Sequence, residues 1–453
     1  MEFIIEYSWA IGMICALIAG VFTGYPVAFL LCGLGVLFAV MSGIPLGFMG
    51  TIVSKIYAGI LSNWLLLAAP LFIYMGLMLD KSGLAQRLLL TLERLCGQLP
   101  GGLALSVAVL GIVMAASTGI VGASVMLLGV IALPVMLRQG YDKKFAAGVT
   151  AATGTLGILI PPSIMLVFMG AILQVSIGDL FKAALFPGLM LGTLYILYIL
   201  GVGFFTPHRA PVPSLKALDD VNKGHSDSLM LELVKNLLGP LLLIGAVLGS
   251  IITGIATPTE AAGIGAAGAT LLAWITRKLN FPVLRDVVRD TSKTTAMVIF
   301  VMIGAACFSA VFKRLGGDTM IEEMFLGTGF GPYGLLVLMM GLIFIMGFFL
   351  EWIEISFIVL PLFAPIIKVL DFGFDSTGTE LLVWFAILAA MNMQTSFITP
   401  PFGYSLFYLR GVAPKGVTIQ DIYKSSIPFV ILQLICLALI VAFPSIVLWI
   451  TRI

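Results

Sequence analysis

Two clusters of hydroxyl, glycine and proline residues lie in apolar segments that are each long enough to cross a bilayer. The first cluster is Thr153–Ser163 and the second is Gln394–Gly403. Each contains a tandem proline, Pro161-Pro162 or Pro400-Pro401, and proline interrupts a helix because it has no backbone N–H. Hydrocarbon cannot satisfy the freed backbone groups, so each break must be buried in protein or line a polar cavity. Two such breaks in corresponding halves of a chain are typical of the binding site of a secondary transporter.

An interrupted helix supplies groups that can bind an anion and groups that can bind a cation. The N-terminal end of a half-helix presents amides to a carboxylate, whereas unwound carbonyls and nearby hydroxyls coordinate Na⁺. The alternative is tight helix packing by small residues, which explains single glycines but not paired breaks. The predicted sodium-binding residues are Ser117, Thr118, Gly119, Gly122, Thr153, Gly154, Thr155, Thr395, Ser396, Thr399 and Gly403, and the predicted substrate-binding residues are Ser117, Ser124, Ser163, Glu351 and Ser356.

Carboxylates at membrane depth are costly, so each one is a functional candidate. Glu351 is the preferred residue for a substrate or gating role, and its alternative is an exposed position at the tip of a hairpin. Glu354 is equally consistent with a position that faces water. Glu260 follows a Thr-Pro-Thr sequence, as a helix-capping acid does, and Asp142 and Asp375 indicate turns at helix entries. So few carboxylates, with no histidine among the apolar segments, favour Na⁺ over a proton relay.

The composition excludes most other classes of protein. Hydrophobic residues make up 60% of the 453 residues and charged residues 10%, and the mean hydropathy is +1.14. Such a chain is a polytopic membrane protein, and a net charge of +2 gives no indication of nucleic-acid binding. Neither a phosphate-binding loop nor an intramembrane Ser/His or Asp pair is present, so we expect no enzyme activity and no cofactor other than a coupling ion.

The apolar segments predict an all-α polytopic fold, an inverted repeat of the elevator type. Segments 100–137 and 332–370 are too long for one span and are interrupted near Ser117–Gly122 and Glu351–Glu354, which indicates two re-entrant hairpins. Five crossings separate the hairpins, so they enter from opposite faces. The expected parts are N-terminal scaffold helices with an interfacial arm (1–99), a first transport half (100–182, with hairpin 100–137 and broken helix 144–175), scaffold helices with a cytoplasmic loop (183–331, loop 206–235), a second transport half (332–411, with hairpin 332–370 and broken helix 380–410) and a C-terminal helix (412–453).

The basic residues give an independent test of this topology. If the loops that flank the first hairpin are cytoplasmic, 18 of the 24 Lys and Arg residues face the cytoplasm, as the positive-inside rule requires. Both termini then face outward, into the periplasm of a Gram-negative bacterium. The six basic residues left on the outer face are Lys55, Lys182, Lys313, Arg314, Lys368 and Arg452.

Five motifs in this order resemble the large membrane subunit of the TRAP (tripartite ATP-independent periplasmic) transporters. They are Ser117–Ala123, Gly140–Asp142, Thr153–Ser163, Ala256–Ala262 and Met391–Gly403, and the similarity covers nearly the whole chain. The resemblance implies a Na⁺-driven elevator in the bacterial inner membrane, in which the hairpins and broken helices move against a scaffold. It also implies two partners: a small four-helix membrane subunit, expected here as a separate polypeptide, and a periplasmic substrate-binding protein.

The same resemblance implies organic acids as substrates, including C4-dicarboxylates, sialic acid, other sugar acids and aromatic acids. Glu351 stands where the family more often has aspartate. Two other functions stay open from the residues alone: a stand-alone Na⁺- or H⁺-coupled organic anion symporter of related fold, and a channel. A channel has no need of two inverted broken-helix devices.

Overall fold

The computed structural model describes residues 2–96, 99–118, 121–212 and 237–452, and no strand occurs in these ranges. Six helices in the described part are long and apolar enough to cross a membrane, or seven if the bent pair α19 (Trp352–Ile358) and α20 (Leu360–Val369) counts as one. The predicted all-α polytopic class is confirmed. Re-entry of the hairpins, the division into scaffold and transport parts and the orientation of the termini stay predictions.

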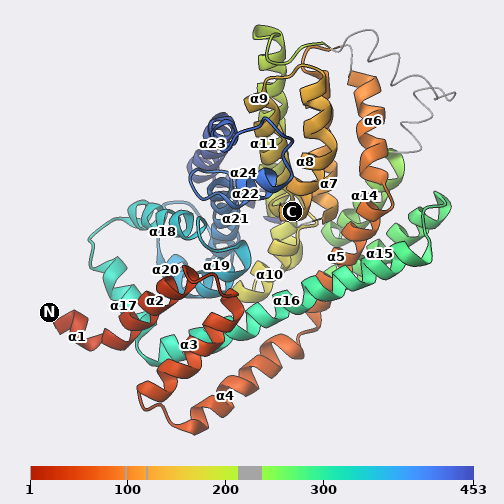
Figure 1. Ribbon diagram of the computed structural model, residues 1–453. Helices are drawn as coiled ribbons and strands as arrows, with labels where there is room; N and C mark the ends of the chain where they lie inside the picture. The colour runs from red at the N-terminus through yellow and green to blue at the C-terminus, as the bar shows by residue number, and fades with distance from the viewer. Residues whose placement is uncertain (1, 97–98, 119–120, 213–236, 453) are drawn as a thin grey trace.

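The N-terminal helices pack against helices from the middle of the chain (Figure 1). Helix α3 lies along α16 (Phe281–Arg314), and α5 packs on both α16 and α15 (Pro258–Ile275). The contact between α3 and α16 is close because a Cβ atom on Gly304 would lie 2.6 Å from the carbonyl oxygen of Ala28. The N-terminal helices are α1 (Glu2–Glu6), α2 (Ser8–Val21), α3 (Val27–Met41), α4 (Leu46–Ile56), the π-helical turn η1 (Tyr57–Leu61), the 3₁₀ turn η2 (Trp64–Leu67), α5 (Ala68–Lys81) and α6 (Leu84–Cys96).

Helix α6 ends the segment predicted to hold scaffold helices and an interfacial arm (1–99), and it packs against α7 (Gly102–Thr118). Its apolar side chains Ala85, Leu88 and Leu92 are buried. Gln139 donates to the carboxylate of Glu93 over 2.5 Å, which ties this helix to the loop after the first hairpin. Segment 46–61, which the hydropathy pattern leaves as a connection, is also helical, as α4 and η1.

The first half contains its predicted broken helix. Helices α7 and α8 (Val121–Arg138) pack against each other, and the interruption predicted at Ser117–Gly122 includes residues 119 and 120, which lie outside the described residues. The broken helix consists of α9 (Lys143–Gly154), η3 (Leu156–Ile158) and α10 (Ile164–Leu173). Asp142 is the N-cap of α9 and accepts the Phe145 N–H over 3.0 Å, so its predicted turn position is confirmed.

Among the described residues, the halves are connected by α11 (Ile177–Phe205), α14 (Gly239–Ile252), α15 and α16, after which α17 (Gly317–Leu326) leads to the second hairpin. The predicted loop 206–235 lies mostly outside the described residues. Glu260 is exposed and forms a capping box with Thr257 at the start of α15, so the capping interpretation of this acid is confirmed.

The second half repeats the pattern with a shifted break in its hairpin. Helix α18 (Pro332–Met346) ends before Gly347, α19 begins at Trp352 just after Glu351, and α20 follows at a 53° bend. The chain therefore opens over Gly347–Glu351, earlier than the predicted Glu351–Glu354, because Glu354 already belongs to the first turn of α19. The second broken helix consists of α21 (Gly378–Phe397) and α22 (Tyr404–Val412).

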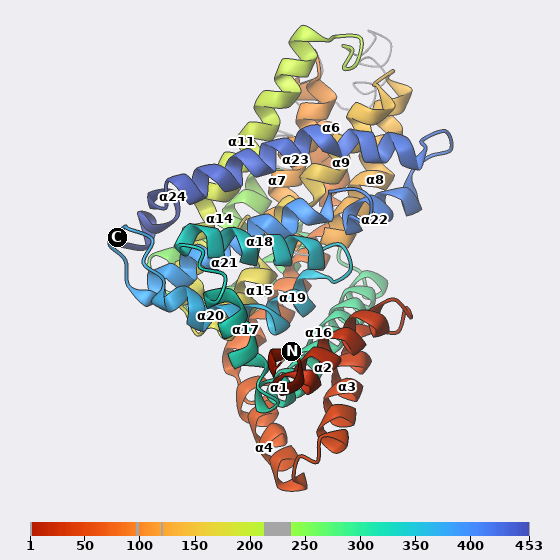
Figure 2. The same ribbon diagram turned by 90° about the vertical axis from the view of Figure 1, so that its left-hand side faces the viewer.

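The C-terminal segment crosses both halves. Figure 2 shows α23 (Ile419–Ala442) lying over α9 and α11, where Gln433 donates to the Tyr195 hydroxyl over 2.8 Å. The predicted C-terminal helix (412–453) is interrupted, because Pro444 cannot continue α23, and two short turns follow. These turns are α24 (Ser445–Leu448) and η5 (Ile450–Arg452).

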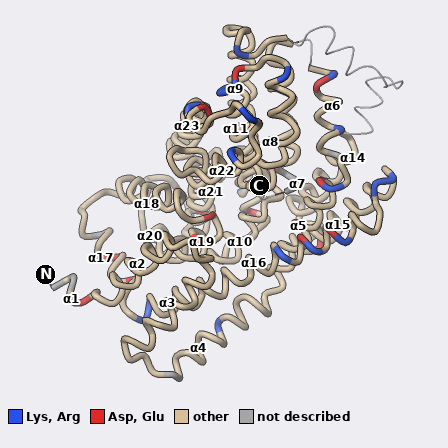
Figure 3. The backbone as a smooth tube through the Cα atoms, viewed as in Figure 1, with Lys and Arg blue, Asp and Glu red and all other residues tan. Residues whose placement is uncertain are grey.

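Charge is distributed unevenly over the molecule. In Figure 3 the Lys and Arg residues gather on α6, α8 and α9 and where α5, α15 and α16 meet, whereas α2 and α17–α20 are nearly free of them. The cytoplasmic and periplasmic sides assigned from the basic residues stay a prediction.

Candidate functional site

Both diproline segments interrupt their helices at the predicted positions. Helix α9 ends at Gly154 and α10 begins at Ile164, so Pro161-Pro162 lies between them. Helix α21 ends at Phe397 and α22 begins at Tyr404, on either side of Pro400-Pro401. Both Pro-Pro bonds are cis. The four predicted helix-breaking prolines therefore lie outside regular helix, and each break is followed by the N-terminal end of a half-helix.

The first break packs directly on the first hairpin. A Cβ atom on Gly154 would lie 2.6 Å from Cγ2 and 2.9 Å from Cα of Val125, which is on α8. Thr153 and Thr155 are fully buried beside this contact. Only glycine lets the two backbones approach so closely, so the small residues of this motif fix the hairpin against the broken helix.

A buried hydrogen bond joins the two breaks to each other. Gln394 Nε2, near the end of α21, donates to Thr155 Oγ1 over 3.2 Å. The Oε1 atom of Gln394 is buried without a hydrogen-bond partner. The sequence interpretation did not select Gln394, although an amide side chain in an apolar helix is itself a signal of function at membrane depth.

The second hairpin meets the second broken helix in two places. A Cβ atom on Gly347 would lie 2.8 Å from Cβ of Ser396, so the start of the hairpin tip rests on the end of α21. Tyr408 on α22 donates its hydroxyl to Glu351 Oε1 over 3.0 Å. Sequence analysis did not select Tyr408, since its carboxylate partner lies 57 residues away.

Tyr408 also contacts the first hairpin. A Cβ atom on Gly122, in the first turn of α8, would lie 2.8 Å from the Tyr408 ring. This tyrosine therefore lies between the beginning of α8 and the tip residue Glu351. Through Tyr408 and Gln394, the second broken helix contacts the first broken helix and both hairpins, and the polar residues at these contacts and at the two breaks are here called the polar cluster.

The hydroxyl groups of the cluster are oriented toward their own helices. Each donates to a backbone carbonyl of its own segment. A hydroxyl has one proton and two lone pairs, so after this donation its oxygen presents lone pairs, which suit a cation better than an anion. The distances are 2.7 Å for Thr153 to Val149, 2.8 Å for Thr155 to Ala152, 2.9 Å for Thr395 to Met391, 2.8 Å for Ser396 to Met393 and 2.7 Å for Thr399 to Thr395.

Two of the four predicted substrate serines have the same orientation. Ser163 donates to Ile158 over 2.6 Å and Ser356 donates to Trp352 over 2.6 Å. Their helices lie together, since the rings of Phe168 on α10 and Trp352 on α19 are 6.0 Å apart. To bind a substrate carboxylate, each hydroxyl would have to rotate away from its present backbone partner.

Glu351 and Glu354 are more buried than their alternative interpretations from the sequence expected. Glu354 is only 7% exposed, so the alternative in which it faces water is wrong. Glu351 is half-buried rather than exposed. The Oε2 atom of Glu354 has no hydrogen-bond partner in the described part of the chain. A buried carboxylate oxygen without a donor is costly and attracts a cation.

Some of the predicted sodium- and substrate-binding residues lie at or next to residues that the structure does not describe. Ser117 and Thr118 are the last residues of α7, and Gly119 is outside the described residues. Ser124 is buried on α8, and Gly403 begins α22 with its backbone turned against Phe397. Among the described residues, no group of three or more His, Cys, Asp or Glu side chains is placed to hold a metal ion.

Comparison with known proteins agrees with this architecture. Residues 14–446 match the family model described as "Tripartite ATP-independent periplasmic transporter, DctM component". The chain is 31% identical over 387 residues to the C4-dicarboxylate TRAP transporter large permease protein DctM of Pseudomonas aeruginosa, covering 85% of each chain. It is 32% identical to the isethionate TRAP transporter permease protein DctMQ of Oleidesulfovibrio alaskensis, covering 84% of this chain and 57% of that protein.

A solved structure shares the fold. The crystal structure of the YdaH transporter of Alcanivorax borkumensis superposes with a TM-score of 0.59 over 88% of this chain and 89% of that one, at 15% sequence identity. The match to the family model covers nearly the whole sequence, and both helix breaks lie in motifs that carry the resemblance. The chain therefore belongs to the DctM family, the large permease component of the tripartite ATP-independent periplasmic transporters, and is a multi-pass inner-membrane transport protein rather than an enzyme.

Proposed function

We propose that this chain is the membrane permease of a Na⁺-coupled, binding-protein-dependent importer of small organic acids. It works with a small membrane subunit and with a periplasmic protein that delivers the substrate. The relatives named for C4-dicarboxylates and for isethionate differ in their acidic group, carboxylate in one and sulfonate in the other. The common chemistry is a compact organic anion.

The observation that carries this proposal is the convergence of two sequence-distant breaks in one polar cluster. Gln394 reaches Thr155 across a sequence separation of 239 residues, and Tyr408 reaches Glu351 on the second hairpin. A site built by both halves can open to one face and then to the other, as alternating access requires. A single broken helix would not provide this arrangement.

Na⁺ coupling is supported by the oxygen groups of the cluster. The predicted sodium ligands at both breaks present hydroxyl lone pairs and unwound carbonyls, and Glu354 adds a buried carboxylate oxygen without a partner. The substrate anion is assigned to the N-terminal ends of α10 and α22, which carry partial positive charge and free amides. A bound Na⁺ also lowers the cost of bringing that anion close to Glu351.

We assign the movement to the hairpins and broken helices, which slide as an elevator against a scaffold. The scaffold includes α3, α5, α15 and α16, which pack mainly on one another. The orientation follows the distribution of basic residues, with both termini on the periplasmic side. The predicted substrate residues then lie on the moving body.

The test is uptake into proteoliposomes that contain the purified permease and its small subunit. A radiolabelled organic acid is supplied on the binding protein, with an inward Na⁺ gradient, an inward proton gradient or no gradient. Uptake that requires the Na⁺ gradient, the small subunit and the binding protein together supports the proposal. Undiminished uptake by this chain alone would favour the stand-alone symporter, and continuous current without saturation would favour a channel.

A further inference from the structure

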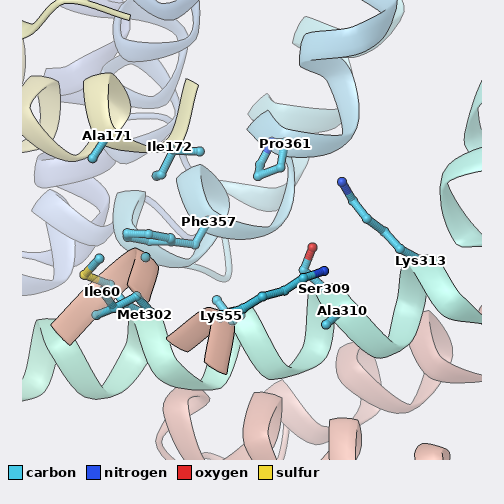
Figure 4. Close-up of a pocket in the computed structure, with 13 residues that line it drawn as sticks. Lys55, Ile60, Ala171, Ile172, Met302, Ser309, Ala310, Lys313, Phe357 and Pro361 are labelled. Atoms are coloured by element: carbon cyan, nitrogen blue, oxygen red, sulfur yellow. The ribbon is translucent and has the colours of Figure 1, made fainter. Parts of the chain in front are cut away.

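A pocket separates the N-terminal helices from the second hairpin, away from the polar cluster. Its volume is about 300 Å³, and α4, η1, α16, α10, α19 and α20 all contribute to its lining. Two lysines reach it from different elements: Lys55 from α4 and Lys313 from α16 (Figure 4). The other walls are small or apolar, including Ile172 and Phe357. This volume is at the lower limit of small-molecule sites.

The two lysines are uncompensated. Within the described residues neither has an ion-pair partner, whereas Lys81 pairs with Asp290 and Arg452 with Glu380. Figure 4 shows the Lys55 side chain running toward Ser309 and the Lys313 side chain turning toward Pro361, so both lie along the pocket. A hydroxyl donor therefore accompanies the two ammonium groups.

A third cation lies next to this pocket. Arg314 follows Lys313 on α16, and its guanidinium lies 6.0 Å from the ring centroid of Phe48 on α4. In the orientation proposed above, only six basic residues are on the outer face, and Lys55, Lys313 and Arg314 are half of them. Like charges repel one another, so a cluster on the face that is otherwise poor in basic residues indicates an anionic ligand.

We propose that this pocket binds an amphiphilic anion. The ammonium groups of Lys55 and Lys313 hold its phosphate or carboxylate group, Ser309 donates to the same group, and Ile60, Ile172 and Phe357 contact its apolar part. Two sources can supply this chemistry: an anionic phospholipid of the surrounding bilayer, or a free organic acid. The large apolar side chains Val53, Tyr57 and Leu61, which are exposed on the same helical stretch, provide a surface for the rest of a lipid molecule.

The position of the pocket gives the ligand influence over movement. One wall belongs to α4 and α16 and the opposite wall to α10, α19 and α20, which the proposed function assigns to the scaffold and the moving body. An anion that contacts both walls stabilises the arrangement in which they are closest. This consequence rests on the proposed function, whereas the binding itself does not.

The experiment measures binding to the purified, delipidated permease in detergent, without any ion gradient. One arm counts bound phosphatidylglycerol by native mass spectrometry, with zwitterionic phosphatidylethanolamine as comparison, and the other titrates octanoate by calorimetry. Lys55→Gln and Lys313→Gln should each weaken binding about fivefold, and the double variant about 25-fold. Lys368→Gln, on α20 and outside the pocket, is the matched control and should leave affinity unchanged.

The two arms distinguish the sources. Lysine-dependent binding of phosphatidylglycerol alone identifies the lipid, and lysine-dependent binding of octanoate alone identifies the free acid. If the double variant binds both probes as tightly as the unaltered protein does, the proposal is wrong. Because no Na⁺ or transport is involved, that result would leave the proposed function intact.

Discussion

The two diproline breaks have the same sequence design but different surroundings. Every residue from Thr153 to Ser163 is buried. At the second break the side chains of Pro401 and Phe402 are exposed, and Phe402 retains 45% of its surface. The second break is therefore the more accessible of the two in this structure.

The two diproline breaks also differ in the polar groups beside them. The first break carries hydroxyls and glycine but no carboxylate, whereas the second lies beside Glu351 through Tyr408. The hydrogen bond from Gln394 to Thr155 is the link between them. The first break is thus suited to holding a cation by neutral oxygens, and the second combines such oxygens with charge. The experiments below test this difference, beginning with the largest expected effect.

The closest backbone approach is at the first break. Gly154→Ala would place its new methyl 2.9 Å from Cα of Val125, an atom that cannot move without shifting α8. Overpacking of this kind costs about 2–3 kcal/mol, so we expect a large loss of thermal stability in detergent and of uptake. Gly347→Ala in the second half should cost less, because Oγ of Ser396 can rotate away and because Gly347 lies in the non-helical tip of the hairpin, which can shift to relieve the 2.8 Å approach to Cβ of Ser396.

Gly341→Ala is the control for this pair, since its Cβ would have no atom within 4 Å. It should unfold at the same temperature as the unaltered protein or slightly higher, because alanine favours helix over glycine. Equal losses of thermal stability in Gly154→Ala and Gly347→Ala would show that the two breaks are packed alike. That result would contradict the difference described above.

The next largest effect is expected from losing the hydrogen bond between Tyr408 and Glu351 at the second break. Tyr408→Phe removes the hydroxyl that donates to Glu351, and hydrogen bonds to charged groups contribute about 1.5–3 kcal/mol. We expect the substrate concentration for half-maximal uptake to rise about tenfold or more, with expression unchanged. Tyr333→Phe, which removes a 3.1 Å bond to the Phe372 carbonyl elsewhere in the same hairpin, is the control and should not change it.

Hydroxyls at the two breaks should differ in their effect on Na⁺. Thr155→Val removes an oxygen and also leaves the Gln394 amide without its acceptor, so the Na⁺ concentration for half-maximal uptake should rise about fivefold. Thr395→Val removes only a hydroxyl that donates within its own helix, and about a threefold rise is expected.

Thr150→Val is the matched control, because this buried hydroxyl also donates within α9, to Ala146 over 2.9 Å, but precedes the break. It should leave the Na⁺ dependence as it is. An unchanged Na⁺ dependence in both Thr155→Val and Thr395→Val would show that these hydroxyls are not ligands.

The smallest expected effect concerns the caps of the two broken helices. Asp142 caps α9, and Thr377 caps α21 in a capping box with Glu380. Asp142→Ala and Thr377→Ala should each cost about 0.5–1 kcal/mol of stability, measured as a lower unfolding temperature, with Na⁺ dependence retained. A change in Na⁺ affinity from either variant would mean that the caps do more than start their helices.

Local features were predictable because their causes are local. The diproline breaks, the cap at Asp142 and the capping role of Glu260 follow from which residues lack an N–H or offer a side-chain acceptor to the first turn. The break in the second hairpin was shifted because Gly347 lies four residues before the charged pair, and hydropathy responds to the charges rather than to the turn.

Contacts between distant segments were not predictable from one sequence. Nothing near Glu354 in the chain determines that it is buried, and nothing near Tyr408 indicates a partner 57 residues earlier. The pairing of Lys55 with Lys313 in one pocket depends on how α4 lies along α16.

The sequence by itself determined the class of protein, its membership in the transporter family and the positions at which two helices open. These properties follow from composition and from the backbone chemistry of proline, glycine and hydroxyl residues, which act within a turn or two. The tertiary structure decided which oxygens meet, which acids are buried and which break is exposed, because close packing of helices brings together residues more than 200 positions apart.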